Sequence, residues 1–460
     1  MSAIAVIAIF DIGKTNKKLF LFDENYKVVF EKSERFNEIN DEDGDVCENL
    51  DSLRLFVFDS LCEAFRMKQF RIKAINFSTY GASLVYIDEG GKPLAPLYNY
   101  LKPYPSELSD QFYSKYEGKE KFSLKTASPI LGSLNSGLQL YRLKTQKPQI
   151  FRKVKFALHL PQYLSFLLTG KSYSDITSIG CHTVFWDFEQ NRYHEWVQRE
   201  GVALKLPPIT PSDSAHPVVF PGNNYKVGVG LHDSSAALIP YLVSFGDPFV
   251  LISTGTWCIS LNPFNSSQLT QIELDNDCLS YLQYKGKPVK ASRLFSGFEH
   301  EQQVARIAAY FNEDISKYRT VVFDAKFTKK IKNDESLPEN QNGRGQPDFA
   351  SEDLSTFKND IEAYHQLITD LIDKQVVSTA QVLKGGSVKR IFVDGGFSKN
   401  RVYMHMLAAA FPEIEIYAAS MAQASALGAA LSIHHQWNPG AIPKDIIQLN
   451  YFSSRETITL

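Results

Sequence analysis

Residues 4–18 read IAVIAIFDIGKTNKK and determine how the chain begins to fold. Residues 4–10 form an unbroken apolar run rich in β-branched side chains, which predicts a buried strand. Gly13-Lys14-Thr15 matches the last letters of a P-loop, but the first glycine of that motif would fall at Ala8, inside the strand. A P-loop also continues into a helix, whereas the stretches LFLFD and KVVFE that follow read as two more strands. The sequence therefore predicts a β-hairpin here and not a P-loop.

Composition narrows the class of protein. A chain of 460 residues with 44% hydrophobic content can bury two cores, so we expect two domains. The net charge of −2 gives no electrostatic footprint for nucleic acid or an acidic membrane, and small neutral or anionic ligands stay open. Five scattered cysteines without CxxC spacing argue against disulfides and a zinc site and favour the cytoplasm. The apolar N-terminus lacks a basic region, and no apolar run approaches the roughly 18 residues that span a bilayer.

The pattern along the chain alternates strands and helices. A helix is predicted over 51–68, a strand over 71–81, a hairpin with its turn at 89–91, and helices within 134–170. Residues 247–264 (DPFVLISTGTWCISLNPF) repeat the opening theme of strand, small-residue turn and strand about 240 residues later, which indicates a duplicated architecture. Residues 329–353 read as a surface loop, 353–384 as a helix, 389–411 as a strand, a glycine pair and a helix, and 422–436 as a last helix.

Three turns carry groups suited to a nucleotide. The first offers backbone amides, the Thr15 hydroxyl and the Lys18 ammonium, which bind phosphate, and Asp11 beside it is placed to hold a hydrated Mg²⁺. The second, residues 253–256 (STGT), offers amides and hydroxyls without charge. The third, residues 393–400 (VDGGFSKN), has two glycines against which a flat adenine or ribose ring could lie.

Asp233 lies in GLHDSSAA (230–237), where a strand is expected to pass into a helix. Such an aspartate can be an N-cap that accepts hydrogen bonds from the first turn of the helix. It can equally be a general base that takes a proton from a substrate hydroxyl during phosphoryl transfer. The residues alone leave both interpretations open.

The order of these motifs resembles the FGGY carbohydrate kinases of the actin-like ATPase superfamily. DIGKTN, STYGAS, GLHDSSAA, ISTGTW, VDGGFSKN and ASALGAA follow one another in the family order, from about Ile4 to His435. GLHDSSAA together with TYGAS is most similar to the rhamnulokinase and fuculokinase branch. The resemblance implies two α/β domains of the ribonuclease H-like kind, residues 1–244 and 245–460, with nucleotide and sugar in a cleft between them.

The resemblance also implies roles for individual residues. Asp233 matches the catalytic base and Asp11 the metal-linked carboxylate. The nucleotide phosphates and adenosine are expected at three sets of residues: Gly13, Lys14, Thr15, Asn16 and Lys18; Thr254, Gly255 and Thr256; and Gly395, Gly396 and Asn400. The ketose is expected at Gly81, Ala82, His232 and Asp233.

The implied reaction is transfer of the γ-phosphoryl group of MgATP to a hydroxyl of a ketose similar to rhamnulose, fuculose or xylulose. The implied partner is this small sugar, with no nucleic acid and no membrane, and a homodimer stays open. A sugar- and nucleotide-binding sensor without turnover is the alternative on the same fold, although it has no need of a base such as Asp233. An ATPase that moves a partner protein is a second alternative, and it needs no sugar pocket.

Three features depart from the family pattern. Lys14 and Lys17 stand where most members carry small residues, and solvated charge is favoured over tighter phosphate binding. Gln423 replaces the glutamate that normally begins the last motif. The stretch SRLFSGFEHEQQ (292–303) lacks the usual pattern of the branch, which leaves the sugar unidentified; Glu299 and His300 within it are read either as sugar contacts or as a solvated helix start.

Overall fold

The computed structural model describes residues 3–220, 222–327, 348–421 and 423–453, and most of the loop expected at 329–353 lies outside these ranges. The chain forms two compact units. The first comprises Met1–Ser244, Ser280–Pro288 and Gln423–Ile446, and the second comprises Phe245–Leu279, Val289–Ala422 and Ile447–Leu460. The main segment of the first unit ends at Ser244, and two later segments return to that unit. As a boundary between functional domains, the division after Ser244 stays a prediction.

The first unit is built on a mixed sheet with β1 (Ile4–Ile12) at its centre. β2 (Lys17–Asp23) pairs with it antiparallel, β3 (Val28–Glu34) continues the hairpin, and β6 (Phe70–Thr79) lies parallel on the other side. The sheet is completed by β11 (Ala215–Phe220), β12 (Asn223–Gly228) and the short β13 (Leu231–His232), which pairs parallel with the end of β6. The hairpin predicted from residues 4–31 is confirmed.

Both faces of β1 are buried, which explains its unbroken apolar sequence. Val6, Ala8 and Phe10 share a core with the helix α1 (Leu50–Arg66), and the intervening Ile7 and Ile9 are also fully buried. On this sheet α14 (Ala424–Ser432) contacts both β1 and β6. The other helices of this unit are α2 (Ser106–Lys115), α3 (Lys119–Thr126), α4 (Ser136–Gln146), α5 (Pro148–Lys153), α6 (Leu160–Thr169), α7 (Ile176–Ile179), α8 (Glu195–Arg199), α9 (Asp233–Ser244) and α15 (His434–Trp437).

One predicted element is partly wrong. The turn at residues 88–92 forms, but the main antiparallel partner of β7 (Leu84–Ile87) is β8 (Phe156–His159). The stretch after the turn makes an isolated bridge at Pro93 and a backbone hydrogen bond from Leu94 N to Tyr86 O. β8 lies inside the region expected to be helical. Its four residues are too few to show a strand periodicity between two helices.

The second unit repeats the strand order of the first. Its sheet includes the order β17-β15-β14-β18-β19-β20, with β14 antiparallel to β15 and parallel to β18, as β1 is to β2 and β6. Only the first two residues of the edge strand β16 belong to this unit. The strands are β14 (Phe249–Thr254), β15 (Cys258–Asn262), β16 (Cys278–Leu282), β17 (Pro288–Leu294), β18 (Arg390–Gly395), β19 (Glu415–Ser420) and β20 (Gln448–Phe452). The duplication inferred from the two hairpins is therefore present in the topology.

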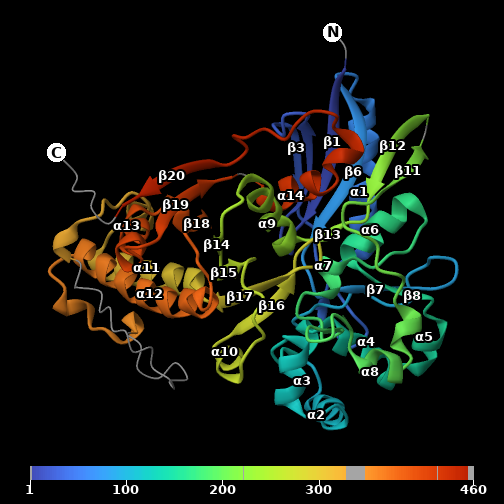
Figure 1. Cartoon of the computed structure of the whole chain (residues 1–460), viewed down its shortest axis with the longest axis horizontal. Helices are drawn as coiled ribbons and strands as arrows, with labels where there is room; N and C mark the ends of the chain where they lie inside the picture. The colour runs from blue at the N-terminus through green and yellow to red at the C-terminus, as the bar shows by residue number, and fades with distance from the viewer. Residues whose placement is uncertain (1–2, 221, 328–347, 422, 454–460) are drawn as a thin grey trace. The chain divides into compact units, whose positions relative to one another are not determined.

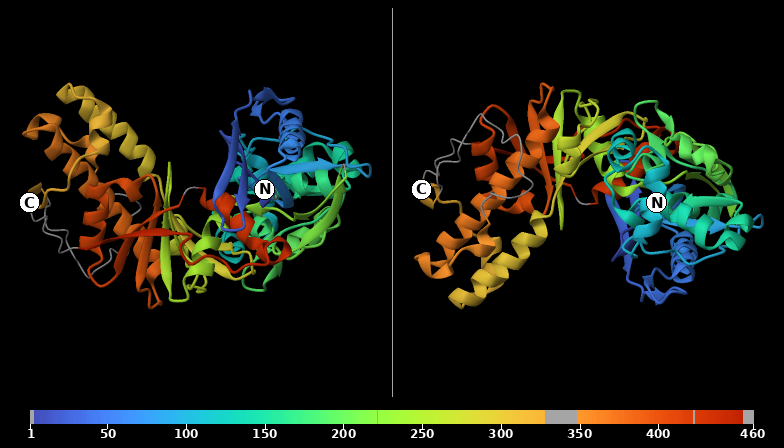
Figure 2. Two further views of the ribbon diagram at one scale, coloured as in Figure 1. Left: turned by 90° about the horizontal axis from the view of Figure 1, so that it is seen from above. Right: turned by 90° about the horizontal axis from the view of Figure 1, so that it is seen from below.

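Helices cover the second sheet as the pattern of residues 353–411 predicts. The long helix α12 (Asp360–Leu383) lies between α11 (Ser296–Phe311) and α13 (Arg401–Ala410), and a short helix, α10 (Gln271–Asp275), precedes β16. Figures 1 and 2 show α11 and α12 side by side. Within the described ranges, none of the helices combines enough length and apolar character to traverse a lipid bilayer.

A close crossing of α9 and α14 holds the first unit together (Figure 1). A Cβ atom on Gly428 of α14 would lie 1.8 Å from the carbonyl oxygen of Ala236 in α9. The small residues of the ASALGAA motif therefore let two helix backbones touch, a contact that no larger residue permits.

We predict that Gly428→Val lowers the free energy of unfolding by about 3 kcal/mol or more, because the added side chain must separate α9 from α14. Urea unfolding of the full chain measures this loss. Gly246→Ala is the matched control, since no atom lies within 4 Å of the position of its new Cβ. Equal stability of the two variants would contradict the close crossing.

Candidate active site

Asp233 is the first residue of α9, directly after β13. Its Oδ1 accepts hydrogen bonds from the backbone and side chain of the adjacent Ser234, at 2.6 and 3.3 Å. An N-cap aspartate binds an amide two or three residues further on, so these contacts are not those of a normal cap. The side chain is 36% exposed, yet its carboxylate is surrounded closely enough by protein that burial raises its pKa to about 6.

Asp11 is a second, partly buried carboxylate in the same unit. It lies near the end of β1, opposite Lys18 on β2 and Ser78 on β6, and its Oδ1 accepts a hydrogen bond of 2.9 Å from Ser425 of α14. Burial raises the pKa of Asp11 to about 6, and the charge of Asp233 adds to this effect. Two dehydrated carboxylates that repel each other favour binding of a hard cation such as Mg²⁺, so the residues fit the predicted metal.

The residues expected at the sugar lie beside Asp233. The buried His232 has its Nε2 3.4 Å from Asp233 Oδ1 and 3.5 Å from Cys181 Sγ. Burial lowers the pKa of His232 to about 4, so the ring is neutral at pH 7, and its buried Nδ1 has no partner among the described residues. A Cβ on Gly81 would lie 2.5 Å from His232 Nε2, which explains the glycine. The next residue, Ala82, has a positive φ of 57°.

The first predicted phosphate turn is a tight hairpin end. Gly13 N donates to Asn16 O at 2.9 Å, while Thr15 is exposed; the amides of Lys14 and Thr15 have no partner in the described part of the chain. The Asn16 side chain accepts a hydrogen bond from Arg35 at 2.8 Å. The two free amides and the Thr15 hydroxyl are thus available to a phosphate.

The lysines of this turn are less free than expected. Lys18 pairs with Glu31 at 3.0 Å and Lys14 with Glu38 at 3.0 Å, both near the surface. Lys17 is only 3% exposed and forms an ion pair of 2.5 Å with the buried Glu48. Lys17 is therefore neither a solvated charge nor a group open to phosphate, and no local pattern in the sequence identifies its partner.

The second predicted turn belongs to the second unit. Thr254 is buried, and its hydroxyl donates to Asp394 O at 2.5 Å and accepts from Phe397 N at 3.0 Å. This hydroxyl joins two strands and is not open to a ligand. Gly255 and Thr256 are exposed, and the carbonyl of Gly255 approaches Gly297 so closely that a Cβ there would lie 1.8 Å away.

The third predicted motif lines a cavity of about 610 Å³ in the second unit. Gly395 has a φ of +89° and would place a Cβ 1.8 Å from Thr254 O, so its role is backbone packing. Gly396 has no atom near the position of a Cβ and faces the cavity, where a flat ring could lie against it. The cavity is lined by Gly255, Gly297, His300, Glu301, Val304, Ile315, Tyr318, Arg319, Tyr364, Gly396, Phe397, Lys399 and Asn400.

Polar groups of this cavity form a chain that sequence analysis did not find. Asn400 Oδ1 caps α13 by accepting from Tyr403 N at 3.1 Å, which leaves its Nδ2 to donate to the Tyr364 hydroxyl at 2.8 Å. That hydroxyl lies 3.3 Å from His300 Nε2, and burial lowers the pKa of His300 to about 4. His300 therefore lines this cavity, while Glu299 is ion-paired with Lys374 at 2.7 Å.

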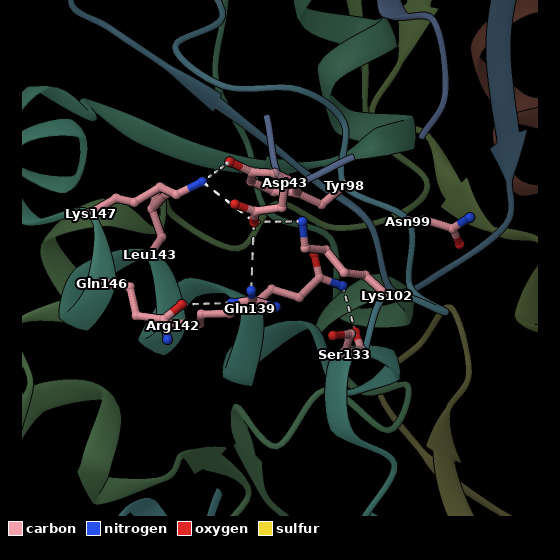
Figure 3. A pocket seen from close by; sticks show the side chains of 10 residues that line it. All are labelled: Asp43, Tyr98, Asn99, Lys102, Ser133, Gln139, Arg142, Leu143, Gln146 and Lys147. Atoms are coloured by element: carbon pink, nitrogen blue, oxygen red, sulfur yellow. Dashed lines mark hydrogen bonds and ion pairs between the residues drawn. The ribbon is translucent and has the colours of Figure 1, made fainter. Parts of the chain in front are cut away.

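A smaller hollow of about 30 Å³ in the first unit has room for little more than a water molecule (Figure 3). Among the described residues, Asp41, Asp43 and Asp45 lie close enough together to hold a metal ion. Lys102 Nζ already contacts all three, at 2.8 Å from Asp43 and 3.0 Å from Asp45. Lys102 thus supplies the positive charge there. Gln139, on the same hollow, donates to Ala82 O at 2.6 Å and supports the predicted sugar loop.

We predict that Asp233→Asn stabilises the metal-free protein at pH 7.5. The folded-state pKa of about 6 exceeds the ordinary 3.8, so stability from this group is present at low pH and is lost as the pH rises through 6. Removing the charge should raise the free energy of unfolding by about 1–2 kcal/mol at pH 7.5, after allowance for the exposed third of the side chain, and by less than half of that at pH 4.5.

Chemical unfolding in EDTA at both pH values measures this difference. Asp59→Asn, at an exposed aspartate of α1, is the control and should change stability at neither pH. A Asp233→Asn variant no more stable than the wild type at pH 7.5 would show that the carboxylate is not dehydrated.

Comparison with known proteins places this geometry in a family. A model described as the FGGY family of carbohydrate kinases, N-terminal domain, matches residues 6–234. A model described as carbohydrate kinase FGGY, C-terminal domain, matches residues 246–440. The first match ends one residue after Asp233, and the second begins three residues before β14.

Curated relatives cover less of the chain. It is 29% identical over 184 residues to a rhamnulokinase of Halalkalibacterium halodurans, which is 38% of this chain and 39% of that protein. It is 24% identical over 267 residues to a rhamnulokinase of Oceanobacillus iheyensis, which is 54% of each. The chain thus aligns with about half or less of the length of these relatives.

Solved structures agree over almost the whole chain. The xylulose kinase from Rhodospirillum rubrum has a TM-score of 0.79 at 15% identity and covers 97% of this chain and 94% of its own. The ligand-bound xylulose kinase from Lactobacillus acidophilus has a TM-score of 0.76 at 16% identity, with 98% and 94% covered. These likenesses confirm the predicted two-domain α/β fold. With both family models matched in order, the chain belongs to the FGGY family of carbohydrate kinases.

Proposed function

We propose that this protein transfers the γ-phosphoryl group of ATP to a hydroxyl of a ketose, of the class exemplified by rhamnulose, fuculose and xylulose. The observation that carries the proposal is the Asp233 carboxylate, which is dehydrated and held against the neutral His232 without serving as a normal helix cap. The relatives named as rhamnulokinases favour a deoxyketose among these sugars.

Asp233 is the proposed general base. With a pKa of about 6 it is mostly ionised at pH 7.5, yet it is more basic than an ordinary aspartate. It accepts the proton of the sugar hydroxyl as that oxygen bonds to the γ-phosphorus, while the bond from phosphorus to the bridging oxygen of ADP breaks. The unpartnered Nδ1 of His232 is available to a second hydroxyl of the sugar and helps to orient it.

The nucleotide is assigned to two sets of groups. The adenosine is proposed to occupy the cavity of the second unit, with its ring against Gly396 and its polar edge near His300 and Asn400. The free amides of Lys14 and Thr15 are proposed to bind phosphate. Asp11 would hold Mg²⁺, which when bound neutralises charge on the phosphates.

We predict that a coupled ADP-release assay with MgATP finds at least one substrate among L-rhamnulose, L-fuculose, L-ribulose, D-xylulose, D-ribulose and glycerol. Asp233→Ala should lower kcat by about 10³-fold or more, because the base is lost, while ADP affinity stays within about two-fold. Asp59→Ala is the control for a surface aspartate and should keep full activity.

An absence of sugar-stimulated ADP release would support the alternative function of a non-catalytic sensor. If several sugars bind by calorimetry, none stimulates ADP release, and Asp233→Ala behaves as the wild type, the protein is a sugar- and nucleotide-binding sensor without turnover. If ADP release rises only with a protein partner, the ATPase alternative holds.

We predict that Gly81→Ala raises the KM for the accepted ketose by about ten-fold or more and leaves the KM for ATP nearly unchanged. The new Cβ would lie 2.5 Å from His232 Nε2 and must displace this ring from its place beside Asp233. Steady-state kinetics with each substrate varied in turn separates the two constants. An unchanged ketose KM would place the sugar elsewhere.

A further inference from the structure

Glu48 occupies a buried position between two segments of the proposed site, the first phosphate turn (residues 13–18) and the acceptor loop (residues 80–82). Its carboxylate is 4% exposed. Oε1 forms the 2.5 Å ion pair with Lys17 Nζ, and Oε2 accepts a hydrogen bond of 2.9 Å from the Tyr80 hydroxyl. One carboxylate therefore binds a side chain from each segment.

Each end of this contact continues into the backbone of its segment. Lys17 Nζ donates to the carbonyl of Lys14 at 2.8 Å, inside the phosphate turn. Tyr80 N donates to Ile12 O at 3.0 Å, and the next residue, Gly81, lies against His232. An unbroken series of contacts thus leads from the turn through Glu48 to the neighbour of Asp233.

The chemistry of the contact argues against a role in stability alone. A buried ion pair adds little stability over apolar residues of similar volume, but it tolerates little displacement because an unpaired charge would remain buried. A shift of Lys14 O on phosphate binding therefore acts on Lys17 and, through Glu48, on Tyr80. Such a network can carry coupling between two sites when both bias its arrangement.

We propose that Glu48 is a positioning residue that couples occupation of the first phosphate turn to the arrangement of the acceptor loop. The proposal rests on the proposed function for the identity of the two ligands. The nucleotide orders the acceptor loop through Lys17, Glu48 and Tyr80, and an acceptor bound at that loop in turn favours the nucleotide, since coupling is reciprocal.

Tyr80→Phe is the primary test, because it removes one hydroxyl and keeps the ring. Glu48→Gln is the second variant, since it leaves the buried Lys17 without a counter-ion and threatens folding. Tyr116→Phe is the matched control. Tyr116 also donates to a buried glutamate, Glu200, which pairs with Lys115 and Lys144, and Tyr116 belongs to a different hydrophobic cluster from Tyr80.

Hydrogen exchange of the full chain with Mg²⁺ and a non-hydrolysable ATP analogue reads the coupling without any sugar. In the wild type and in Tyr116→Phe, the analogue should slow exchange in peptides that cover both 13–18 and 80–84. In Tyr80→Phe, protection of 13–18 should persist and protection of 80–84 should disappear. Full protection of 80–84 in Tyr80→Phe, or its absence in the wild type, overturns the proposal.

A binding measurement gives the same coupling as a ratio. The ketose accepted in the activity assay should tighten ADP binding by about ten-fold in the wild type and by less than about two-fold in Tyr80→Phe. An equal ratio in both proteins also overturns the proposal. If no ketose is accepted, the proposed function fails, whereas the exchange experiment still decides the coupling.

Discussion

The contact between the backbones of α9 and α14 is the constraint on which the first unit depends. α9 begins with Asp233, and α14 carries Ser425, whose hydroxyl binds Asp11. Because Gly428 lets the two helices touch at Ala236, both carboxylates are held near the ends of β1 and β13, partly dehydrated and close enough to interact. A looser crossing would admit water, and the two groups would return to ordinary aspartates.

Partial dehydration of the Asp11 and Asp233 carboxylates lowers the stability of the folded protein but makes the carboxylates more basic. A carboxylate with a raised pKa destabilises the folded state at neutral pH, yet the same shift makes it a stronger base. His232 shows the converse effect, since burial keeps it uncharged beside an acid. The surrounding core of β1, β6 and α1 buries a large set of apolar side chains, whose stabilisation can compensate for these unfavourable groups.

Much of the fold could be predicted because its central strands are buried on both faces and therefore read as continuous apolar runs. The two hairpins, their duplication and the helices after residue 353 follow from such local patterns. β8 could not be predicted, since four residues between helices show no periodicity. The β11–β12 hairpin could not be predicted, because Pro207, Pro208 and Pro211 in the stretch before it interrupt any strand pattern.

The candidate site was predicted less completely than the fold. Asp233, Asp11, Gly81 and Gly396 lie in short motifs, so the neighbouring residues in the sequence were enough to identify them as candidates. Partners far apart in the sequence leave no such record, as for Ser425 with Asp11 or Glu48 with Lys17. The hydrogen bond from the Thr254 hydroxyl to Asp394 O could not be predicted for the same reason, because the sequence does not identify the neighbouring strand.

The return of residues 423–446 to the first unit has a consequence for synthesis of the protein. A ribosome that has made the first 244 residues has produced Asp11, His232 and Asp233 but not the helix that covers their sheet. The nascent N-terminal half therefore exposes the faces of β1 and β6 that α14 later contacts. This unit completes its core only when nearly the whole chain has emerged. A chain truncated before α14 therefore exposes an incomplete sheet whose apolar surface is prone to aggregation.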